Sequence, residues 1–181
     1  MALEILVEGQ LEIERGKIPE DVAADIAIEC QELRDTDPPD NLWHYISGDS
    51  SVEESPTRIQ AAYYYLQVLR SSGLIAMKTV LDLHPHPESR DANLFINIQQ
   101  PGAVQNFHPD YVQGRQVIVH AEDGGLFDYC PDRYDDEHIE TIEVNAGDVL
   151  WLTCPSILHR GRNPSPNPRH VIVMSSNLPV E

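Results

Sequence analysis

The sequence is poor in cysteine and has no long apolar segment. Three cysteines occur in 181 residues, at positions 30, 130 and 154, and no two of them form a CxxC pair. This odd, widely spaced set argues against a disulfide scaffold or a zinc knuckle, so we expect a reducing, cytoplasmic setting. No stretch approaches 18 apolar residues, and the opening MALEILVEGQ lacks a basic segment followed by an apolar run. The sequence therefore predicts neither a membrane span nor a signal peptide.

Basic residues are also scarce. Lys and Arg together number 12 against 30 Asp and Glu, which gives a formal net charge of −18 at pH 7. Such an acidic chain repels phosphate backbones and anionic lipid surfaces, so we expect neither a nucleic acid nor a membrane as its partner. A hydrophobic fraction of 41% is typical of a globular protein. The length favours a single domain over residues 1–181.

The first 73 residues are expected to form a helical support region. Residues 2–7 and 11–14 read as short strands around Gly9-Gln10, and apolar residues recur at helical spacing over about 19–34. Pro19 suits the first turn of that helix. A second helix is expected from Ser55-Pro56 to Gly73, where glycine suits a helix end.

Residues 74–178 change to short β-type runs that are separated by Gly and Pro. Six runs stand out: IAMKTVLDL, NLFINIQ, RQVIVHA, HIETIEV, GDVLWL and HVIVMSS. Many short strands without intervening helices favour an antiparallel sandwich over a βαβ sheet. We therefore predict a mainly β protein whose core is a jelly roll, also called a double-stranded β-helix or cupin-like fold, with the N-terminal helices packed outside it.

The segment NFHPDY places His108 and Asp110 two residues apart, so in an extended chain both side chains point to the same face. His159 follows a later apolar strand, and a sandwich can bring it beside them. Two histidines and one carboxylate leave positions on a metal open, as in non-haem Fe(II) sites. Arg169 follows ten residues after His159, and arginine suits a carboxylate because it forms two parallel hydrogen bonds.

Other residues compete for these roles. The spacing His-x-acid occurs four times, but only His108 has aspartate as its partner. His120 ends a β-type run and replaces His159 if the strand phase is shifted, while Arg160 and Arg162 are rivals of Arg169. The remaining histidines of interest lie in turn-like or acidic segments and are expected on the surface: His84, His86 and His138. Asn97 and Gln99 share one face of their strand, and two inward polar residues are better explained by a pocket than by a core.

The order of these motifs resembles the Fe(II)/2-oxoglutarate-dependent dioxygenase superfamily over about residues 75–176. The local match is closest to the AlkB-type oxidative demethylases, in which an Asn, a Pro-Gly-Ala turn and His-x-Asp appear at the spacing of NIQQPGAVQNFHPD. The resemblance implies that Fe(II) is held by three residues: His108, Asp110 and His159. It also implies that Arg169 pairs with the distal carboxylate of 2-oxoglutarate and that Asn97 helps to bind this cosubstrate, with O2 as the second cosubstrate. Gln99, on the same strand face as Asn97, is a further candidate for the contact with 2-oxoglutarate.

The sequence departs from the AlkB pattern at two positions. Gln99 stands where that pattern has tyrosine, and Ser175 stands where it has a second arginine. No basic, aromatic-interleaved segment is present to hold a nucleic acid. The segment GGLFDY resembles the Gly-Gly turn of prolyl-hydroxylase-type members.

The resulting hypothesis is an enzyme that hydroxylates an unactivated C–H bond of a small molecule or a peptide residue and releases succinate and CO2. Members of the superfamily that halogenate carry a small residue in place of the carboxylate, so Asp110 indicates hydroxylation. The alternative is a cupin-type metal enzyme or metal-binding module that does not use 2-oxoglutarate and has no need of Arg169. A β-sandwich interaction domain without a metal is a third hypothesis.

Overall fold

The computed structural model describes residues 3–35, 44–46, 57–62, 78–79, 82–83, 93–110, 114–132, 137–155 and 157–175. These residues form one long helix, α1 (Glu20–Asp35), and eleven strands. The strands are β1 (Leu3–Val7), β2 (Leu11–Glu14), β3 (His44–Ile46), β4 (Thr57–Ala62), β5 (Asn93–Gln99), β6 (Gly114–His120), β7 (Gly125–Tyr129), β8 (Glu140–Val144), β9 (Val149–Cys154), β10 (His159–Arg162) and β11 (Arg169–Ser175). No helix of the described residues has both the length and the apolar character that a membrane crossing requires.

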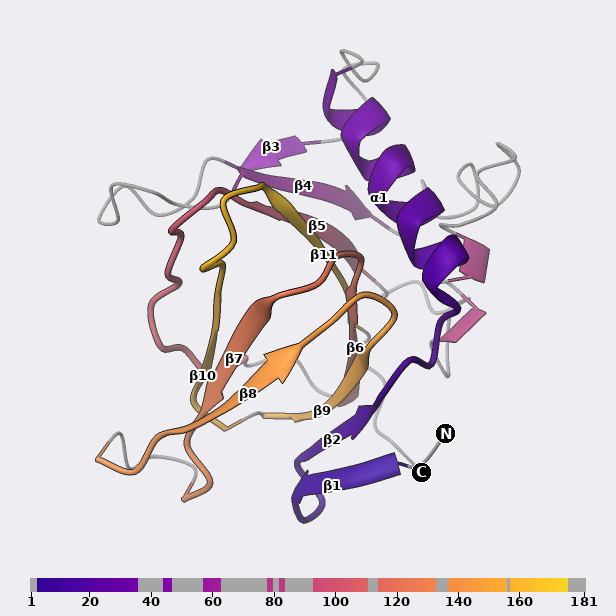
Figure 1. Ribbon diagram of the computed structural model, residues 1–181. Coiled ribbons are helices and arrows are strands. Elements are labelled where there is room, and N and C mark those ends of the chain that lie inside the picture. The colour runs from indigo at the N-terminus through magenta and orange to yellow at the C-terminus, as the bar shows by residue number, and fades with distance from the viewer. Residues whose placement is uncertain are drawn as a thin grey trace.

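The strands form two antiparallel sheets that face each other. The large sheet has the order β1-β2-β9-β6-β11-β5-β4-β3, and the small sheet has the order β10-β7-β8. Figure 1 looks down the space between them, with β7, β8 and β10 on one wall and β5, β6 and β11 on the other. The predicted jelly-roll fold, mainly β with helical cover, is confirmed.

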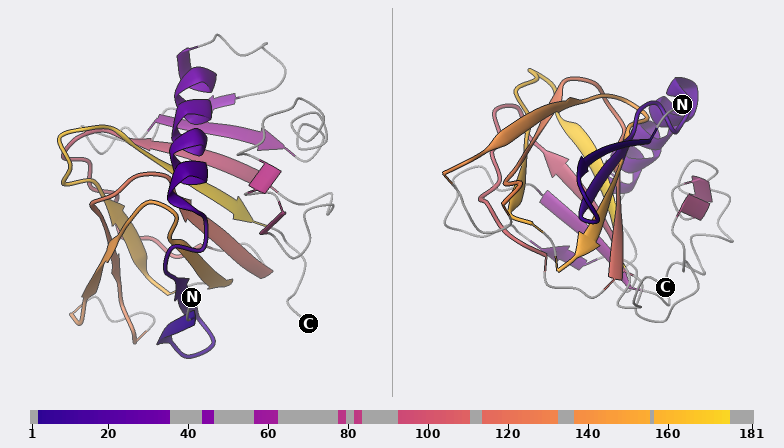
Figure 2. Two further views of the ribbon diagram at one scale, coloured as in Figure 1. Left: turned by 45° about the vertical axis from the view of Figure 1, so that its right-hand side comes forward. Right: turned by 90° about the horizontal axis from the view of Figure 1, so that it is seen from below.

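Helix α1 covers the outer face of the large sheet (Figures 1 and 2). Its buried residues pack with the outward-facing residues of the strands beneath it: Ile26 and Cys30 with Ile96, Val117, Val119, Ile172 and Met174. A second apolar cluster fills part of the space between the two sheets, and it includes Leu11, Ile118, Phe127, Leu150 and Val171. The central strands are therefore buried on both faces, which explains their long apolar runs.

Alternation along the central strands decides which residues face the small sheet. On β11 the even-numbered residues Ile172 and Met174 pack toward α1, so the odd-numbered residues face inward. On β6 the odd-numbered residues Val117 and Val119 pack toward α1, so Gln116, Ile118 and His120 face inward. The inner face of the large sheet thus receives Gln116 and His120 of β6 and Arg169 and Ser175 of β11.

Several predicted elements are confirmed and others are wrong. The strands near the N-terminus, the helix at 19–34 and five of the six β-type runs match observed elements. The second predicted helix is wrong over Thr57–Ala62, because these residues pair with β5 as strand β4. The rest of that prediction, residues 63–73, lies outside the described residues. The run IAMKTVLDL is wrong where it is described, since residues 78–79 and 82–83 are helical.

Candidate metal centre and its cavity

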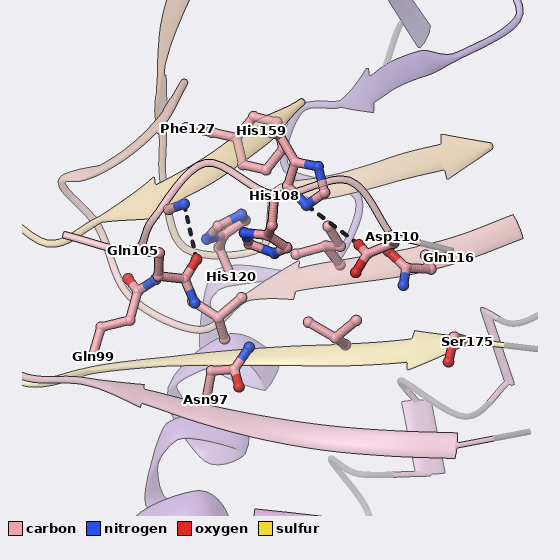
Figure 3. A pocket seen from close by; sticks show the side chains of 14 residues that line it. Asn97, Gln99, Gln105, His108, Asp110, Gln116, His120, Phe127, His159 and Ser175 are labelled. Carbon is pink, nitrogen blue, oxygen red and sulfur yellow. Dashed lines mark hydrogen bonds and ion pairs between the residues drawn. The ribbon is translucent and has the colours of Figure 1, made fainter. Parts of the chain in front are cut away.

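His108, Asp110 and His159 meet at one end of the space between the sheets (Figure 3). One potential ligand atom from each residue lies within 4.8 Å of the others. His159 Nε2 lies 3.3 Å from Asp110 Oδ2, and the two imidazole rings have centroids 4.7 Å apart. In the part of the chain that the structure describes, this is the group of His, Cys, Asp and Glu residues that could hold a metal ion.

Backbone pairing brings the two histidines together across 51 residues of sequence. His108 lies in the segment between β5 and β6, and it forms an isolated antiparallel bridge with His159, the first residue of β10. The two residues exchange both backbone hydrogen bonds, each with a nitrogen-to-oxygen distance of 3.1 Å. The two main-chain hydrogen bonds therefore explain how His108 and His159 lie side by side although they are far apart in the sequence.

Each histidine ring is fixed by a second hydrogen bond. His108 Nδ1 lies 2.8 Å from the carbonyl oxygen of Asn106, and His159 Nδ1 lies 3.0 Å from that of Ile157. Because a carbonyl oxygen can only accept, both Nδ1 atoms donate, and Nε2 carries a lone pair when a ring is neutral. This is the tautomer in which Nε2 binds a metal, with the backbone acting as the outer support of the ligand. His159 Nε2 lies 3.3 Å from Asp110 Oδ2 and donates to it only when it carries a proton, so a metal takes the place of that contact when it binds to the neutral ring.

Asp110 is held in its charged form. Burial by itself raises the pKa of a carboxyl group, but here the hydrogen bond and charge of His159, with smaller contributions from His108 and Gln116, lower the pKa of Asp110 below its usual value. An ionised carboxylate beside the Nε2 atoms of two histidines matches the two-nitrogen, one-oxygen ligand set of facial-triad sites. The three residues thus fit a divalent transition metal such as iron.

The small sheet supports the metal end of the cavity from behind. The Phe127 ring stacks on the His159 ring, with centroids 5.4 Å apart and an interplanar angle of 19°. On the opposite face of the same strands, buried Asp128 accepts hydrogen bonds from Arg160 Nε and Arg162 Nη2, both at 2.7 Å. Arg160 and Arg162 are thereby engaged away from the cavity, which removes them as rivals of Arg169.

A cavity of about 130 Å³ extends from the three candidate ligands between the sheets. Its lining includes polar side chains from three strands, β5, β6 and β11, and from the segment that carries His108 and Asp110: Asn97, Gln99, Gln105, Gln116, His120 and Ser175. Apolar contacts come from Ile118, Phe127, Val171 and Val173. The sequence prediction that Asn97 and Gln99 face a pocket is confirmed by their position in this lining and by exposed fractions of 6% and 3%.

Arg169 lies at the inner edge of this space, behind His120. Its side chain is 1% exposed, Nη2 donates to the carbonyl oxygen of Glu122 at 2.9 Å, and Nη2 lies 3.4 Å from His120 Nδ1. Arg169 Nε and Nη1 find no hydrogen-bond partner among the described residues, and neither does His120 Nε2. The charges of Glu122 and Asp123 act favourably on Arg169, but its buried Nε and Nη1 donors stay unused, so this corner fits a carboxylate that accepts from them.

Two glycines of the small sheet make room for these side chains. A methyl group on Gly125 would overlap the Arg169 guanidinium, and one on Gly161 would lie 2.5 Å from Gln99 Nε2 and 2.9 Å from Gln105 Oε1. The absence of a side chain at both positions therefore allows the polar groups of the large sheet to occupy the space between the sheets.

The structure brings together most of the residues that the sequence singled out and adds others. Asn97 and Gln99 share the cavity lining with the three candidate ligands, whereas Arg169 lies behind His120 and outside that lining. His138 is exposed, as expected, and His84 and His86 lie outside the described residues. Sequence reasoning treated His120 as a substitute ligand, and it did not identify three further lining residues: Gln105, Gln116 and Phe127.

Comparison with known proteins shows the fold. No protein-family model and no curated protein matches the chain. Among solved structures, the α-ketoglutarate-dependent carbocyclase SnoK from nogalamycin biosynthesis has a TM-score of 0.64 at 13% identity, covering 95% of this chain and 89% of SnoK. The α-ketoglutarate-dependent epimerase SnoN of the same biosynthesis has a TM-score of 0.62 at 12% identity, covering 92% and 78%. A Pseudomonas putida prolyl-4-hydroxylase has a TM-score of 0.56 at 15% identity, covering 91% of each chain.

Two of these structures are non-haem, 2-oxoglutarate-dependent enzymes and the third is a prolyl hydroxylase. This chain shares their fold. Identities of 12–15% carry no assignment of activity. The closer sequence resemblance to the AlkB type stays a prediction.

Proposed function

We propose that this protein is an Fe(II)- and 2-oxoglutarate-dependent oxygenase that hydroxylates a C–H bond of a small molecule or a peptide residue. The observation that carries the proposal is the placing of two features close together between the sheets. His108, Asp110 and His159 present a candidate metal-ligand set at the cavity, with Nδ1 of both rings hydrogen-bonded to backbone carbonyls. Buried Arg169 lies behind His120, which lines the same cavity, and keeps unused donors suited to a carboxylate. The architecture shared with 2-oxoglutarate-dependent enzymes supports the same reading.

The residues of this chain have separate tasks in that chemistry. When bound, the metal would allow O2 to oxidise an unactivated C–H bond, with 2-oxoglutarate as the second electron donor; one oxygen atom would go to the substrate and the other to succinate, with release of CO2. The Asn106 and Ile157 carbonyls hold the ligand rings in orientation. Phe127 covers one face of His159 and excludes water from that side. Arg169 compensates the negative charge that the cosubstrate brings into the cavity.

Substrate contacts are expected from the carboxamides that line the cavity. The Oε1 atoms of Gln99 and Gln116 have no hydrogen-bond partner among the described residues, and both face the cavity. Carboxamides can accept from or donate to neutral polar groups, which agrees with a small polar molecule or a peptide as substrate. A nucleic acid is not part of the proposal, because a chain with a formal net charge of −18 repels a phosphate backbone.

An anaerobic titration tests the proposal. The Fe(II)-loaded protein is titrated with 2-oxoglutarate while the visible charge-transfer absorption of the chelate is followed. We expect a saturable band that Asp110→Ala abolishes through loss of iron and that Arg169→Ala shifts to higher 2-oxoglutarate concentration. Asp132→Ala, which removes an acid whose side chain is 68% exposed, is the matched control and leaves the band unchanged.

The outcomes separate the competing functions. Iron binding without a band in the wild-type protein would refute the proposal and favour a cupin-type metal protein. No iron binding would leave a β-sandwich without a metal. Since the structural neighbours include a carbocyclase and an epimerase, mass analysis of a turned-over substrate decides the reaction type. A product heavier by one oxygen atom supports hydroxylation.

A further inference from the structure

His120 stands between the Arg169 guanidinium and the cavity, a place where the sequence resemblance assigned no cosubstrate contact. We propose, on the basis of the proposed function, that His120 donates a hydrogen bond from Nε2 to the distal carboxylate of 2-oxoglutarate. Arg169 lies behind it, fixes its tautomer and supplies the positive charge. His120 is therefore a cosubstrate-binding residue, and it is distinct from the three metal ligands.

Strand geometry directs the His120 side chain into the cavity. On β6 it shares the inward phase of Gln116 and Ile118, and it is paired with Val171 of β11. Its side chain lines the cavity (Figure 3) although the residue is only 3% exposed. The group of candidate metal ligands does not include His120 within the described residues, so its ring is available for another ligand.

Arg169, on the side of His120 away from the cavity, determines which ring nitrogen of His120 carries the proton. Arg169 Nη2 lies 3.4 Å from His120 Nδ1, and a guanidinium can only donate. Nδ1 therefore accepts, and in the neutral ring Nε2 carries the hydrogen. That N–H has no acceptor among the described residues. A buried donor that faces a cavity without an acceptor is costly and indicates that a ligand supplies one.

The electrostatics of this corner favour an anion. Burial, and next the charge of Arg169, lower the pKa of His120 well below its usual value, so the ring is neutral at physiological pH. Arg169 contributes one positive charge and two further unused donors, Nε and Nη1. A carboxylate beside these groups would accept from His120 Nε2 and neutralise the charge of Arg169. The 2-oxo acid end of 2-oxoglutarate would bind the metal at His108, Asp110 and His159. The distal carboxylate is therefore the end that fits beside the donors of His120 and Arg169.

Two 2-oxo acids separate this contact from binding at the metal. 2-Oxoglutarate carries a distal carboxylate, and 2-oxopentanoate has the same five-carbon chain without it. Dissociation constants of both acids are measured under anaerobic conditions on the Fe(II)-loaded wild-type protein, His120→Leu and His120→Gln. The exposed His138, whose side chain is 61% exposed, provides the control variant His138→Leu.

We expect His120→Leu to raise the dissociation constant of 2-oxoglutarate about 10- to 100-fold, the range for a hydrogen bond to a charged group. Binding of 2-oxopentanoate and of Fe(II) should stay within about threefold, because neither uses the His120 donor. His120→Gln keeps a neutral donor and should recover most of the lost affinity. His138→Leu should match the wild-type protein for both acids.

Three results would overturn the inference. Equal losses for both acids would assign His120 a structural role, and unchanged 2-oxoglutarate binding would show that its N–H contacts nothing. A wild-type protein that binds iron but neither acid would refute the proposed function, and the inference would fall with it. If His120→Leu does not fold, the His120 Nε2 resonance in ¹⁵N spectra of the Zn(II)-loaded wild-type protein decides. The inference requires that resonance to shift with 2-oxoglutarate and not with 2-oxopentanoate.

Discussion

Gly124, in the loop before β7, and Gly125, the first residue of β7, are expected to respond differently to substitution by alanine. Gly124 has a φ of +75°, and a methyl group added there would meet nothing within 4 Å. Gly125 has no such backbone requirement, but its added methyl group would overlap the guanidinium of buried Arg169. Gly124→Ala therefore tests backbone strain alone, and Gly125→Ala tests the space that Arg169 occupies.

The sizes of the two effects follow from these contacts. Gly124→Ala should cost about 1–2 kcal/mol of the free energy of unfolding, the strain of a left-handed alanine. Gly125→Ala should cost about 3 kcal/mol. This sum combines overpacking of the closed site with displacement of Arg169 from its 2.9 Å hydrogen bond to the Glu122 carbonyl. Displacement of Arg169 should also weaken 2-oxoglutarate binding, whereas Gly124→Ala should leave that binding unchanged.

Urea unfolding of a double-mutant cycle measures the coupling. In an Arg169→Ala background the guanidinium is absent, so the added methyl of Gly125→Ala should cost less than about 1 kcal/mol. The unfolding slopes of the four proteins should agree, which shows that the native states are equally compact. If Gly125→Ala costs the same with and without Arg169, the reasoning that this glycine exists to accommodate the guanidinium is refuted.

Two further predictions concern buried groups outside the cavity. Burial would raise the pKa of Asp128, but hydrogen bonds from Arg162, Arg160 and Thr141 lower it below 3.8. The ionised carboxylate therefore contributes fully to the free energy of unfolding above about pH 5, and this contribution declines as the pH falls below 3.8. In urea unfolding, Asp128→Asn should cost about 2 kcal/mol of the free energy of unfolding at pH 7, the value for lost hydrogen bonds to a charged group, and clearly less at pH 3. An equal cost at both pH values would contradict the assignment. Cys30 and Cys130 are fully buried, and burial raises the pKa of Cys30. In a Cys154→Ser variant, a thiol reagent should therefore label them only as fast as the protein unfolds, and rapid labelling would contradict this packing.

The candidate metal-ligand set could be predicted because few residue types can hold a metal in this arrangement. A His-x-Asp pair on an extended segment and a later histidine after a strand are visible in the sequence, and so is an arginine ten residues further on. The structure brings His108, Asp110 and His159 within reach of one metal. The inward phase of Asn97 and Gln99 was also predictable, since polar residues at alternate positions of an apolar strand are costly without a pocket.

Other parts of the structure depend on contacts that the sequence does not show. Thr57–Ala62 contains good helix formers, yet pairing with β5 makes it a strand, so tertiary context overrides local propensity. Strand β10 was missed because HRGR contains no apolar residue. Its two arginines are satisfied by Asp128 on the neighbouring strand β7. A signal was present, since an aspartate within the apolar run GLFDY requires a cationic partner.

The function of His120 shows the same limit at the level of one residue. A histidine at the end of an apolar strand is compatible with a core residue, a metal ligand or a hydrogen-bond donor. The choice depends on which atom faces Nδ1, and that atom belongs to Arg169, 49 residues further along the chain. Only the antiparallel pairing of β6 with β11 brings the two side chains together.

The apolar contacts of helix α1 with the large sheet offset the loss of apolar packing caused by the polar cavity. In a sandwich of two sheets alone, the inner faces must supply the apolar core, and polar residues there reduce it. Here the outward faces of β5, β6 and β11 bury their apolar residues against α1. These contacts add to the apolar cluster between the sheets, in which Ile118 and Val171 take part, so the inner face can also carry polar residues: Asn97, Gln99, Gln116, His120 and Arg169. The helix stabilises the fold on the side opposite the site, so the amphipathic segment at residues 20–35 is as necessary to the cavity as the residues that line it.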